Sequence, residues 1–259
     1  KKKVDLVVVA VPACFTPEVT EDCGKAGIKD ILMVTAGFSE IGDKEIEEKL
    51  FKVIKKYNMR LLGPNCLGTI DIHSGIDLIF LPSIRLKRPP KGGISFICQS
   101  GAVGSATLDL LAKQGLGFSK FVSYGNANNI TETDLLEYLS NDPKTKVICM
   151  YIEGVKEGKK FMEVAKKVSK KKPIVVLKGG MTKKGAEATL SHTASLAGAV
   201  EVYRGVFRQT GIVEATTLDE LFNFAKVLEK SMKPKGKRVQ VITNGGGFGI
   251  LCADNIERV

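Results

Sequence analysis

Short apolar runs alternate with amphipathic, lysine-rich segments along most of this chain, and that alternation constrains the fold more than any other feature. The first three runs, residues 4–12, 31–37 and 59–65, are predicted strands, with helices expected near 17–27 and 43–56 between them. Apolar strands separated by helices are typical of parallel sheets that are covered on both faces. The sequence therefore predicts an α/β fold.

A second series of the same kind follows an interruption. Residues 76–92 contain Pro82, Pro89 and Pro90, and we interpret this segment as a linker or domain edge. Beyond it the predicted strands are 93–101, 117–126, 145–154, 172–180 and 211–215. The predicted helices are 102–114, 131–140, 158–171, 199–209 and 217–230. After a lysine-rich linker, residues 238–256 predict one more strand, a glycine turn and the start of a helix.

Composition excludes several classes of protein. The formal net charge is +11, but the lysines interleave with glutamates and no aromatic platform accompanies them, so we expect no nucleic-acid partner. No apolar run reaches membrane-spanning length and the first residues fit a signal peptide poorly, so we expect no membrane association and a cytoplasmic protein. The six cysteines lack C-x-x-C spacing, which predicts neither a metal site nor a disulfide framework. The high Lys and Glu content without Trp is typical of thermophiles.

The turns after the predicted strands are the candidate binding sites, because open α/β sheets bind ligands at the carboxyl ends of their strands. The turn 35–40, Thr-Ala-Gly-Phe-Ser-Glu, follows the second strand, and the turn 63–68, Gly-Pro-Asn-Cys-Leu-Gly, follows the third. Either could be a purely structural turn, with Ser39 as a helix N-cap in the first case.

A third turn leads from a predicted buried strand through Ser100 into a helix. The backbone N–H groups at such a helix N-terminus form a ready site for an anion, although Ser100 could simply cap the helix. The surrounding residues 98–104 match neither the G-x-S-x-G of hydrolases nor a dinucleotide or phosphate-loop motif.

Two titratable residues, Glu153 and His192, are candidate catalytic residues. Glu153 ends the most central predicted strand, where a carboxylate is costly unless it is paired or functional. The alternative is that Glu153 merely caps the next helix. His192 lies in the stretch 188–198, Ala-Thr-Leu-Ser-His-Thr-Ala-Ser-Leu-Ala-Gly, among small residues that leave the imidazole accessible. No further zinc ligands and no nucleophile elbow accompany it, which leaves the role of a nucleophile whose ring an acid such as Glu153 orients. A lone histidine is more often structural, but a core histidine would be surrounded by bulkier residues than these.

Taken in order, seven blocks carry a resemblance to a known family. The blocks GFSEIG, GPNCLG, CQSGAVG, SYGN, YIEG, SHTASLAG and TNGGGFGI resemble the NDP-forming acyl-CoA synthetases. The ADP-forming acetyl-CoA synthetases are most similar, and the α chain of succinyl-CoA synthetase is more distant. The resemblance implies that residues 1–88 are the C-terminal half of a Rossmann-type CoA-binding domain. Residues 89–230 would be a flavodoxin-like domain with the phosphohistidine, and 231–259 the start of a third, similar domain.

The resemblance also implies a reaction, acyl-CoA + ADP + phosphate ⇌ carboxylic acid + ATP + CoA, through a phosphohistidine at His192 that Glu153 orients. The implied phosphate-binding residues are Ser100, Gly101, Ala102, Gly125 and Asn126. The implied CoA-binding residues are Pro12, Ala13, Gly37, Phe38, Pro64, Asn65 and Cys66.

Some family features differ or are missing here. Ala194 stands where the family usually has glycine, and Phe248 where it commonly has proline. The glycine-rich first half of the CoA-binding domain is absent from the sequence, as is the ATP-grasp module that would bind ADP or ATP with Mg²⁺. The resemblance therefore implies an ATP-grasp β-type subunit or fused domain, and a hetero-oligomer.

Two other functions stay open. A non-catalytic CoA-sensing module related to these synthetases is less favoured, because His192 and Glu153 are both present. A nicotinamide dehydrogenase is less favoured because no G-x-G-x-x-G follows a predicted strand.

Overall fold

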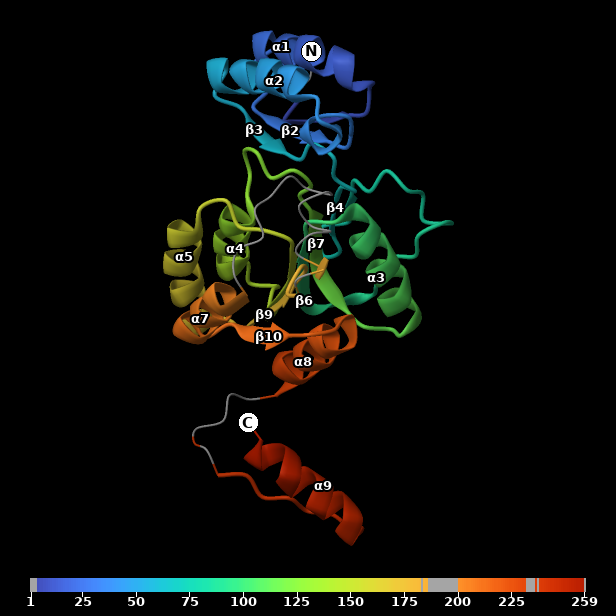
Figure 1. Cartoon of the computed structure of the whole chain (residues 1–259). Coiled ribbons are helices and arrows are strands. Elements are labelled where there is room, and N and C mark those ends of the chain that lie inside the picture. Colours follow the sequence, from blue (N-terminus) through green and yellow to red (C-terminus); the bar gives the residue numbers. More distant parts are fainter. Residues whose placement is uncertain (1–3, 183, 186–199, 232–235, 237, 259) are drawn as a thin grey trace.

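The computed structural model describes residues 4–182, 184–185, 200–231, 236 and 238–258, which contain two α/β units and a C-terminal helix (Figure 1). The first unit has a parallel sheet with the strand order β1-β2-β3. Its strands are Leu6–Val9, Asp30–Met33 and Arg60–Leu62. Its helices are α1 (Thr16–Lys25) and α2 (Lys44–Lys56), with short 3₁₀ helices η1 (Ala13–Phe15) and η2 (Ser39–Ile41) before them.

Helix α2 shows why this unit folds as the sequence predicts. Asp43 caps it, with the carboxylate accepting a hydrogen bond from the Ile46 N–H at 3.2 Å. Leu50 and Ile54 on its inner face are buried in the same core cluster as Met33 of β2. The apolar stripe therefore packs on the sheet, and the charged face remains in water.

The second unit has a seven-stranded sheet with the order β10-β9-β8-β6-β7-β4-β5. Its strands are β4 (Thr69–Asp71), β5 (Ile76–Asp77), β6 (Lys91–Cys98), β7 (Phe118–Ser123), β8 (Val147–Ile152), β9 (Ile174–Lys178) and β10 (Val213–Ala215). Its helices are α3 (Gly101–Lys113), α4 (Glu132–Asn141), α5 (Gly158–Lys171), α7 (Val200–Thr210) and α8 (Leu218–Lys230). Strands β6 to β10 are parallel, so the predicted α/β class is confirmed.

Two short strands correct the sequence analysis. Strands β4 and β5 pair antiparallel, and β4 continues antiparallel along β7, so both belong to the second sheet. The expectation that residues 1–88 all lie in the first unit does not hold for this pair. Segments this short and only partly apolar show no strand pattern in the sequence, and the edge of β7 supplies the hydrogen bonds of β4.

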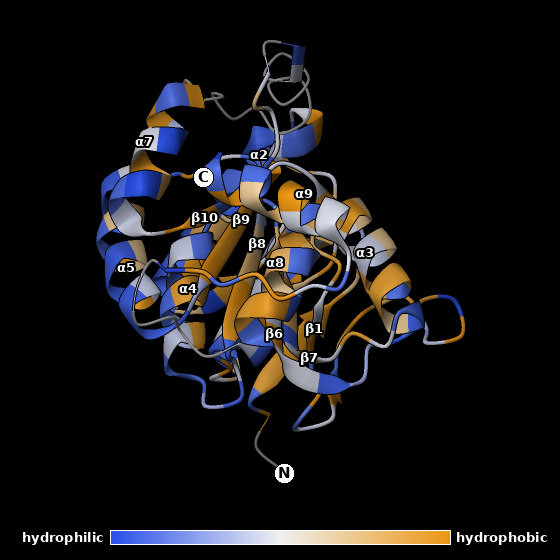
Figure 2. Cartoon of the chain, turned by 90° about the horizontal axis from the view of Figure 1, so that it is seen from below, coloured by the Kyte–Doolittle hydropathy of each residue, from blue (hydrophilic) through white to orange (hydrophobic). Residues whose placement is uncertain are grey.

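Helices cover both faces of the second sheet. Along β6, Phe96 and Cys98 belong to the core under α3 and α8, whereas Ile97 points to the opposite core under α4, α5 and α7. This alternation follows from the period of two along a strand. Figure 2 shows the apolar strands in the middle of the molecule and hydrophilic residues along much of α5 and α7 outside them.

The C-terminal segment departs from prediction in one respect. Helix α9 (Gly246–Glu257) follows the glycine turn as expected. Residues 238–242, expected as a strand, form none, and Val239, Val241 and Ile242 are exposed. A strand needs a neighbour for its hydrogen bonds, and the described part of the chain places none there. No helix in that part is both long enough and apolar enough to cross a bilayer.

Candidate functional site

The winding of the second sheet changes direction between β6 and β8. The chain passes from β6 through α3 to β7 on one side, and then through α4 to β8 on the other side of β6. In open α/β sheets such a switch point leaves a crevice at the carboxyl ends of the strands, where ligands bind. The candidate site is therefore expected at the turns after Cys98 and Ile152.

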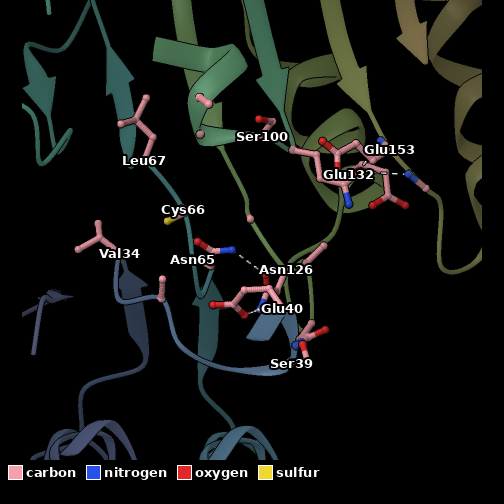
Figure 3. Close-up of a pocket in the computed structure, with 18 of the residues that line it drawn as sticks. Val34, Ser39, Glu40, Asn65, Cys66, Leu67, Ser100, Asn126, Glu132 and Glu153 are labelled. Atoms are coloured by element: carbon pink, nitrogen blue, oxygen red, sulfur yellow. Dashed lines mark hydrogen bonds between the residues drawn. The ribbon is translucent and has the colours of Figure 1, made fainter. Parts of the chain in front are cut away.

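A cleft of about 920 Å³ lies at these strand ends, between the two units. It brings together eight of the predicted site residues: Asn65, Cys66, Ser100, Gly101, Ala102, Gly125, Asn126 and Glu153. Figure 3 shows the Asn65 and Asn126 side chains facing each other near Glu40. His192 and Ala194 lie outside the described residues.

The N-terminus of α3 forms one wall of the cleft. The Ser100 hydroxyl accepts a hydrogen bond from the Val103 N–H at 3.2 Å, so the capping role that the sequence left open is confirmed. The backbone N–H groups of Gly101 and Ala102 line the same wall, and within the described ranges neither donates to an acceptor. These two donors and the positive end of the helix dipole can therefore receive an anion.

Glu153 follows β8 and is 8% exposed. Its backbone N–H donates to the Gln99 side-chain oxygen at 2.7 Å. The alternative that Glu153 caps the next helix is wrong, because α5 begins at Gly158 with Glu157 as its N-cap. The carboxylate instead lines the cleft.

The turn after β7 joins the second unit to the first. The Asn126 backbone N–H donates to the Pro64 carbonyl at 3.0 Å, and the Asn126 side-chain oxygen accepts from Asn65 Nδ2 at 3.2 Å. Gly125 has φ +57°, and a Cβ there would lie 2.1 Å from the Pro64 oxygen. Glycine is thus required where the two backbones meet.

The predicted CoA-binding residues of the first two strand ends lie close together but do not line the cleft. Residues Pro12 and Ala13 follow β1, and a Cβ on Gly37 would be 3.3 Å from the Ala13 Cβ. Phe38 is fully buried in the core of the first unit. The N–H groups of Gly37 and Phe38 donate to Glu40 Oε1 at 2.5 and 3.2 Å, so this carboxylate occupies both donors.

Glu40 is therefore a central residue that the sequence analysis did not select. Burial acts to raise the pKa of this carboxyl, but the hydrogen bonds from Asn126 and Gly37 outweigh it and the pKa is lowered. The Asn126 amide nitrogen donates to Glu40 Oε2 at 2.7 Å. Glu40 and Asn126 are 86 residues apart in the sequence, so no local pattern reveals their contact.

Glu132 and Lys156 were also missed. Glu132 starts α4, is 1% exposed and lines the cleft, and burial raises the pKa of its carboxyl. Lys156 lines the same wall, donates to the Asn126 carbonyl at 2.7 Å, and has its pKa lowered by burial. The sequence signal of Glu132 was ordinary, since acidic residues are common in a first helical turn.

No group of three or more His, Cys, Asp or Glu side chains suited to a metal ion occurs among the residues that the structure describes. The cleft offers backbone donors, side-chain amides and carboxylates. Backbone and amide N–H groups of this kind can donate hydrogen bonds to anions and to carbonyl oxygens.

A three-stranded Rossmann-like unit joined to a doubly wound sheet, with the cleft at the switch point, defines a class of nucleotide- and cofactor-binding α/β proteins. Residues 91–228 match the model of the succinyl-CoA ligase like flavodoxin domain, and residues 1–71 match that of the CoA binding domain. The chain belongs to the NDP-forming acyl-CoA synthetase family, as the seven sequence blocks predicted.

The relatives share most of this chain. It is 46% identical over 252 residues to the ADP-forming acetate–CoA ligase of Methanocaldococcus jannaschii, covering 97% of this chain and 35% of that protein. It is 42% identical over 258 residues to the α subunit of ADP-forming acetate–CoA ligase II from Pyrococcus furiosus, covering 99% and 55%.

A solved structure is also similar over the whole chain. This is the dinucleotide-forming acetyl-coenzyme A synthetase 1 of Ca. Korarchaeum cryptofilum, in complex with phosphate and ADP, with a TM-score of 0.94 and 40% identity. The match covers 99% of this chain and 55% of that one. The chain thus spans between about a third and about half of the length of these relatives.

Proposed function

We propose that this chain is the CoA-binding and phosphohistidine-carrying part of an ADP-forming acyl-CoA synthetase. It would interconvert acyl-CoA, ADP and phosphate with a carboxylic acid, ATP and CoA. The observation that carries the proposal is the cleft, where Glu153 and the N-terminus of α3 lie opposite Asn65 and Cys66 of the first unit. The relatives named as ADP-forming acetate–CoA ligases support the reaction class.

The cleft suits the first chemical step. A phosphate oxygen attacks the thioester carbonyl carbon, the C–S bond breaks, and CoA leaves with the electron pair and takes up a proton. The Gly101 and Ala102 N–H groups would hold the phosphate for this attack, because a transferring phosphoryl group needs positioning and charge neutralisation. Residues of the first unit, with Asn65 and Cys66 in the cleft wall, would hold CoA.

His192 would carry out the second step. One imidazole nitrogen attacks the phosphorus of the acyl phosphate, and the carboxylate leaves with the P–O bonding electrons. Glu153 would accept a hydrogen bond from the other ring nitrogen and stabilise the imidazolium that forms. The phosphoryl group then passes from His192 to ADP, which gives ATP and the free imidazole.

The remaining parts of the reaction would come from a partner. An ATP-grasp β-type subunit or fused domain would bind ADP or ATP with Mg²⁺, in a hetero-oligomer in the cytoplasm. Mg²⁺ would neutralise the charge of the transferring phosphates there. Exposed Phe248, Ile250 and Leu251 on α9 support the reading of 231–259 as the start of a third domain that would cover them.

A CoA-sensing module without catalysis is the second candidate. It is favoured by one observation: Glu40 occupies the Gly37 and Phe38 donors and links them to Asn126 of the second unit. Such a link could report a change at the CoA site to the rest of the molecule. The two candidates differ in whether His192 is phosphorylated.

The deciding experiment uses the full protein with its ATP-grasp partner. Incubation with Mg²⁺ and ATP labelled at the γ-phosphate is expected to place an acid-labile, alkali-stable phosphate on the peptide that contains His192. His192→Asn removes the label, and Glu153→Gln slows its appearance strongly. No label on a protein whose partner demonstrably binds ATP overturns the enzymatic proposal, and CoA binding measured by calorimetry then tests the sensing module.

A further inference from the structure

Gln99 bridges the switch point of the second sheet. It follows β6 directly, and its backbone N–H donates to the Tyr151 carbonyl of β8 at 3.0 Å. Its side chain then crosses to the turn after β8 and lines the cleft. The residue lay inside the block CQSGAVG, but nothing in the sequence indicated where its amide points.

Three donors fix the orientation of this amide. The side-chain oxygen of Gln99 accepts from the Glu153 N–H at 2.7 Å, from the Gly154 N–H at 3.3 Å and from the Tyr124 hydroxyl at 3.3 Å. Backbone N–H groups can only donate, so the oxygen and not the nitrogen of the amide must face them. Tyr124 is fully buried, and burial raises the pKa of its hydroxyl far above the usual value, so it keeps the proton that it donates.

The amide nitrogen is then left for the cleft. Nε2 lies on the other side of the amide carbon from the three donors, and in the described part of the chain it has no acceptor. Gln99 thus presents two N–H bonds from a side chain whose rotation is blocked. Gly101 and Ala102 place their backbone donors on the same cleft only a few atoms further along the chain.

From this geometry we infer that the Gln99 amide nitrogen donates to the carbonyl oxygen of the acyl group while phosphate attacks. The inference rests on the proposed function and assigns a substrate-orienting residue to its first step. The negative charge of a phosphate suits the helix N-terminus of α3, whereas a neutral, fixed amide suits a carbonyl oxygen. That oxygen gains charge as the tetrahedral intermediate forms, and a donor already in place stabilises it without reorganisation.

The test compares two routes to the same phosphohistidine in the holoenzyme. One route starts from acetyl-CoA and labelled phosphate and needs the acyl step, whereas the other starts from labelled ATP and does not. In Gln99→Glu an oxygen still accepts from the Glu153 and Gly154 N–H groups, but both amide N–H donors are lost. We expect the acetyl-CoA route to slow about 10²–10³-fold with little change in KM, and the ATP route to change less than about threefold.

Two further variants separate the donor from charge and folding. Gln99→Met removes the donor without adding a charge, so it should slow the acetyl-CoA route to a similar extent. Gln114→Glu makes the same substitution at the exposed C-terminal end of α3 and should leave both routes unchanged. A merely structural Gln99 would affect both routes together, with a lower melting temperature.

Each outcome decides between the two levels of the proposal. If both routes phosphorylate the wild-type protein, and Gln99→Glu and Gln99→Met react at wild-type rates, the role of Gln99 is overturned. The proposed function then stands. Equal slowing of both routes also overturns the role of Gln99, because the residue then acts on the shared phosphoryl step. Wild-type protein phosphorylated by neither route overturns the proposed function, and the role of Gln99 with it.

Discussion

The side-chain amide of Asn126 donates a 2.7 Å hydrogen bond to the Glu40 carboxylate and thereby joins the turn after β7 to the turn after β2. The other carboxylate oxygen of Glu40 accepts from the Gly37 and Phe38 N–H groups. One ionised side chain therefore holds together the strand ends of two separate sheets.

Asn126→Ala is expected to destabilise the protein in a pH-dependent way. Glu40 is partly buried, and losing a hydrogen bond to an ionised group costs about 1.5–3 kcal/mol of unfolding free energy at neutral pH. The pKa of Glu40 is lowered in the folded protein, so its contribution is present above the ordinary value of 4.5 and is lost as the pH falls below it. Urea unfolding should therefore show the difference between wild type and variant shrinking in acid. Asn141→Ala, on the exposed surface of α4, is the control, and a constant difference would contradict the prediction.

Gly125→Ala is expected to separate the two units locally. The substitution adds a left-handed strain for alanine, of about 1 kcal/mol, to a clash of its Cβ with the Pro64 carbonyl. Gly27→Ala is the matched control, because Gly27 also has a positive φ but nothing lies within 4 Å of its added Cβ. Calorimetry should show a clearly larger loss of stability for Gly125→Ala. Equal losses would mean that the close approach of the two turns does not matter.

The cysteines are expected to fall into two reactivity classes. Cys14 and Cys252 are exposed, whereas Cys23, Cys66, Cys98 and Cys149 are buried. Burial raises the pKa of the Cys66 thiol to about 12, so almost no thiolate forms at mildly alkaline pH. Iodoacetamide followed by peptide mass spectrometry should label the two exposed cysteines first and the other four only in denaturant. Rapid labelling of Cys66 in the native protein would refute its burial.

Glu132→Gln is expected to stabilise the protein increasingly as the pH rises. Burial raises the pKa of Glu132 in the folded state, so the folded protein must ionise a poorly solvated carboxyl above the unfolded value of 4.5. The wild type therefore loses about 1.4 kcal/mol for each unit of that pKa difference, and the glutamine variant does not. Urea unfolding at about pH 4 and about pH 8 measures the difference in unfolding free energy between wild type and variant. A variant that gains nothing at the higher pH would show that Glu132 is ionised without cost.

The sequence predicted those parts of the fold that local patterns determine. Helices such as α2 and α5 have one apolar stripe and a lysine-rich face, and the predicted ranges 43–56 and 158–171 nearly coincide with them. Strands β4 and β5 were missed because they are short and depend on the edge of β7 for their hydrogen bonds.

The sequence predicted which turns form the site, but not the side-chain contacts within it. Ser100, Glu153 and Asn65 follow strands, and parallel strands bring their carboxyl ends together, so their meeting could be expected. The orientation of the Gln99 amide depends on N–H groups 54 and 55 residues away. The hydrogen bond of Glu40 depends on Asn126, which belongs to the other unit. Such contacts exist only once the chain has folded.

The pairing of β4 with β7 also determines where this protein can be divided into separately produced pieces. A break at residue 88 would remove β4 and β5 from the sheet and leave an edge of β7 open for pairing with other chains. A break between β3 and β4 keeps each sheet whole. Placed after Asn65, such a break would separate Asn65 from Asn126, so the cleft would form only when the two pieces recombine.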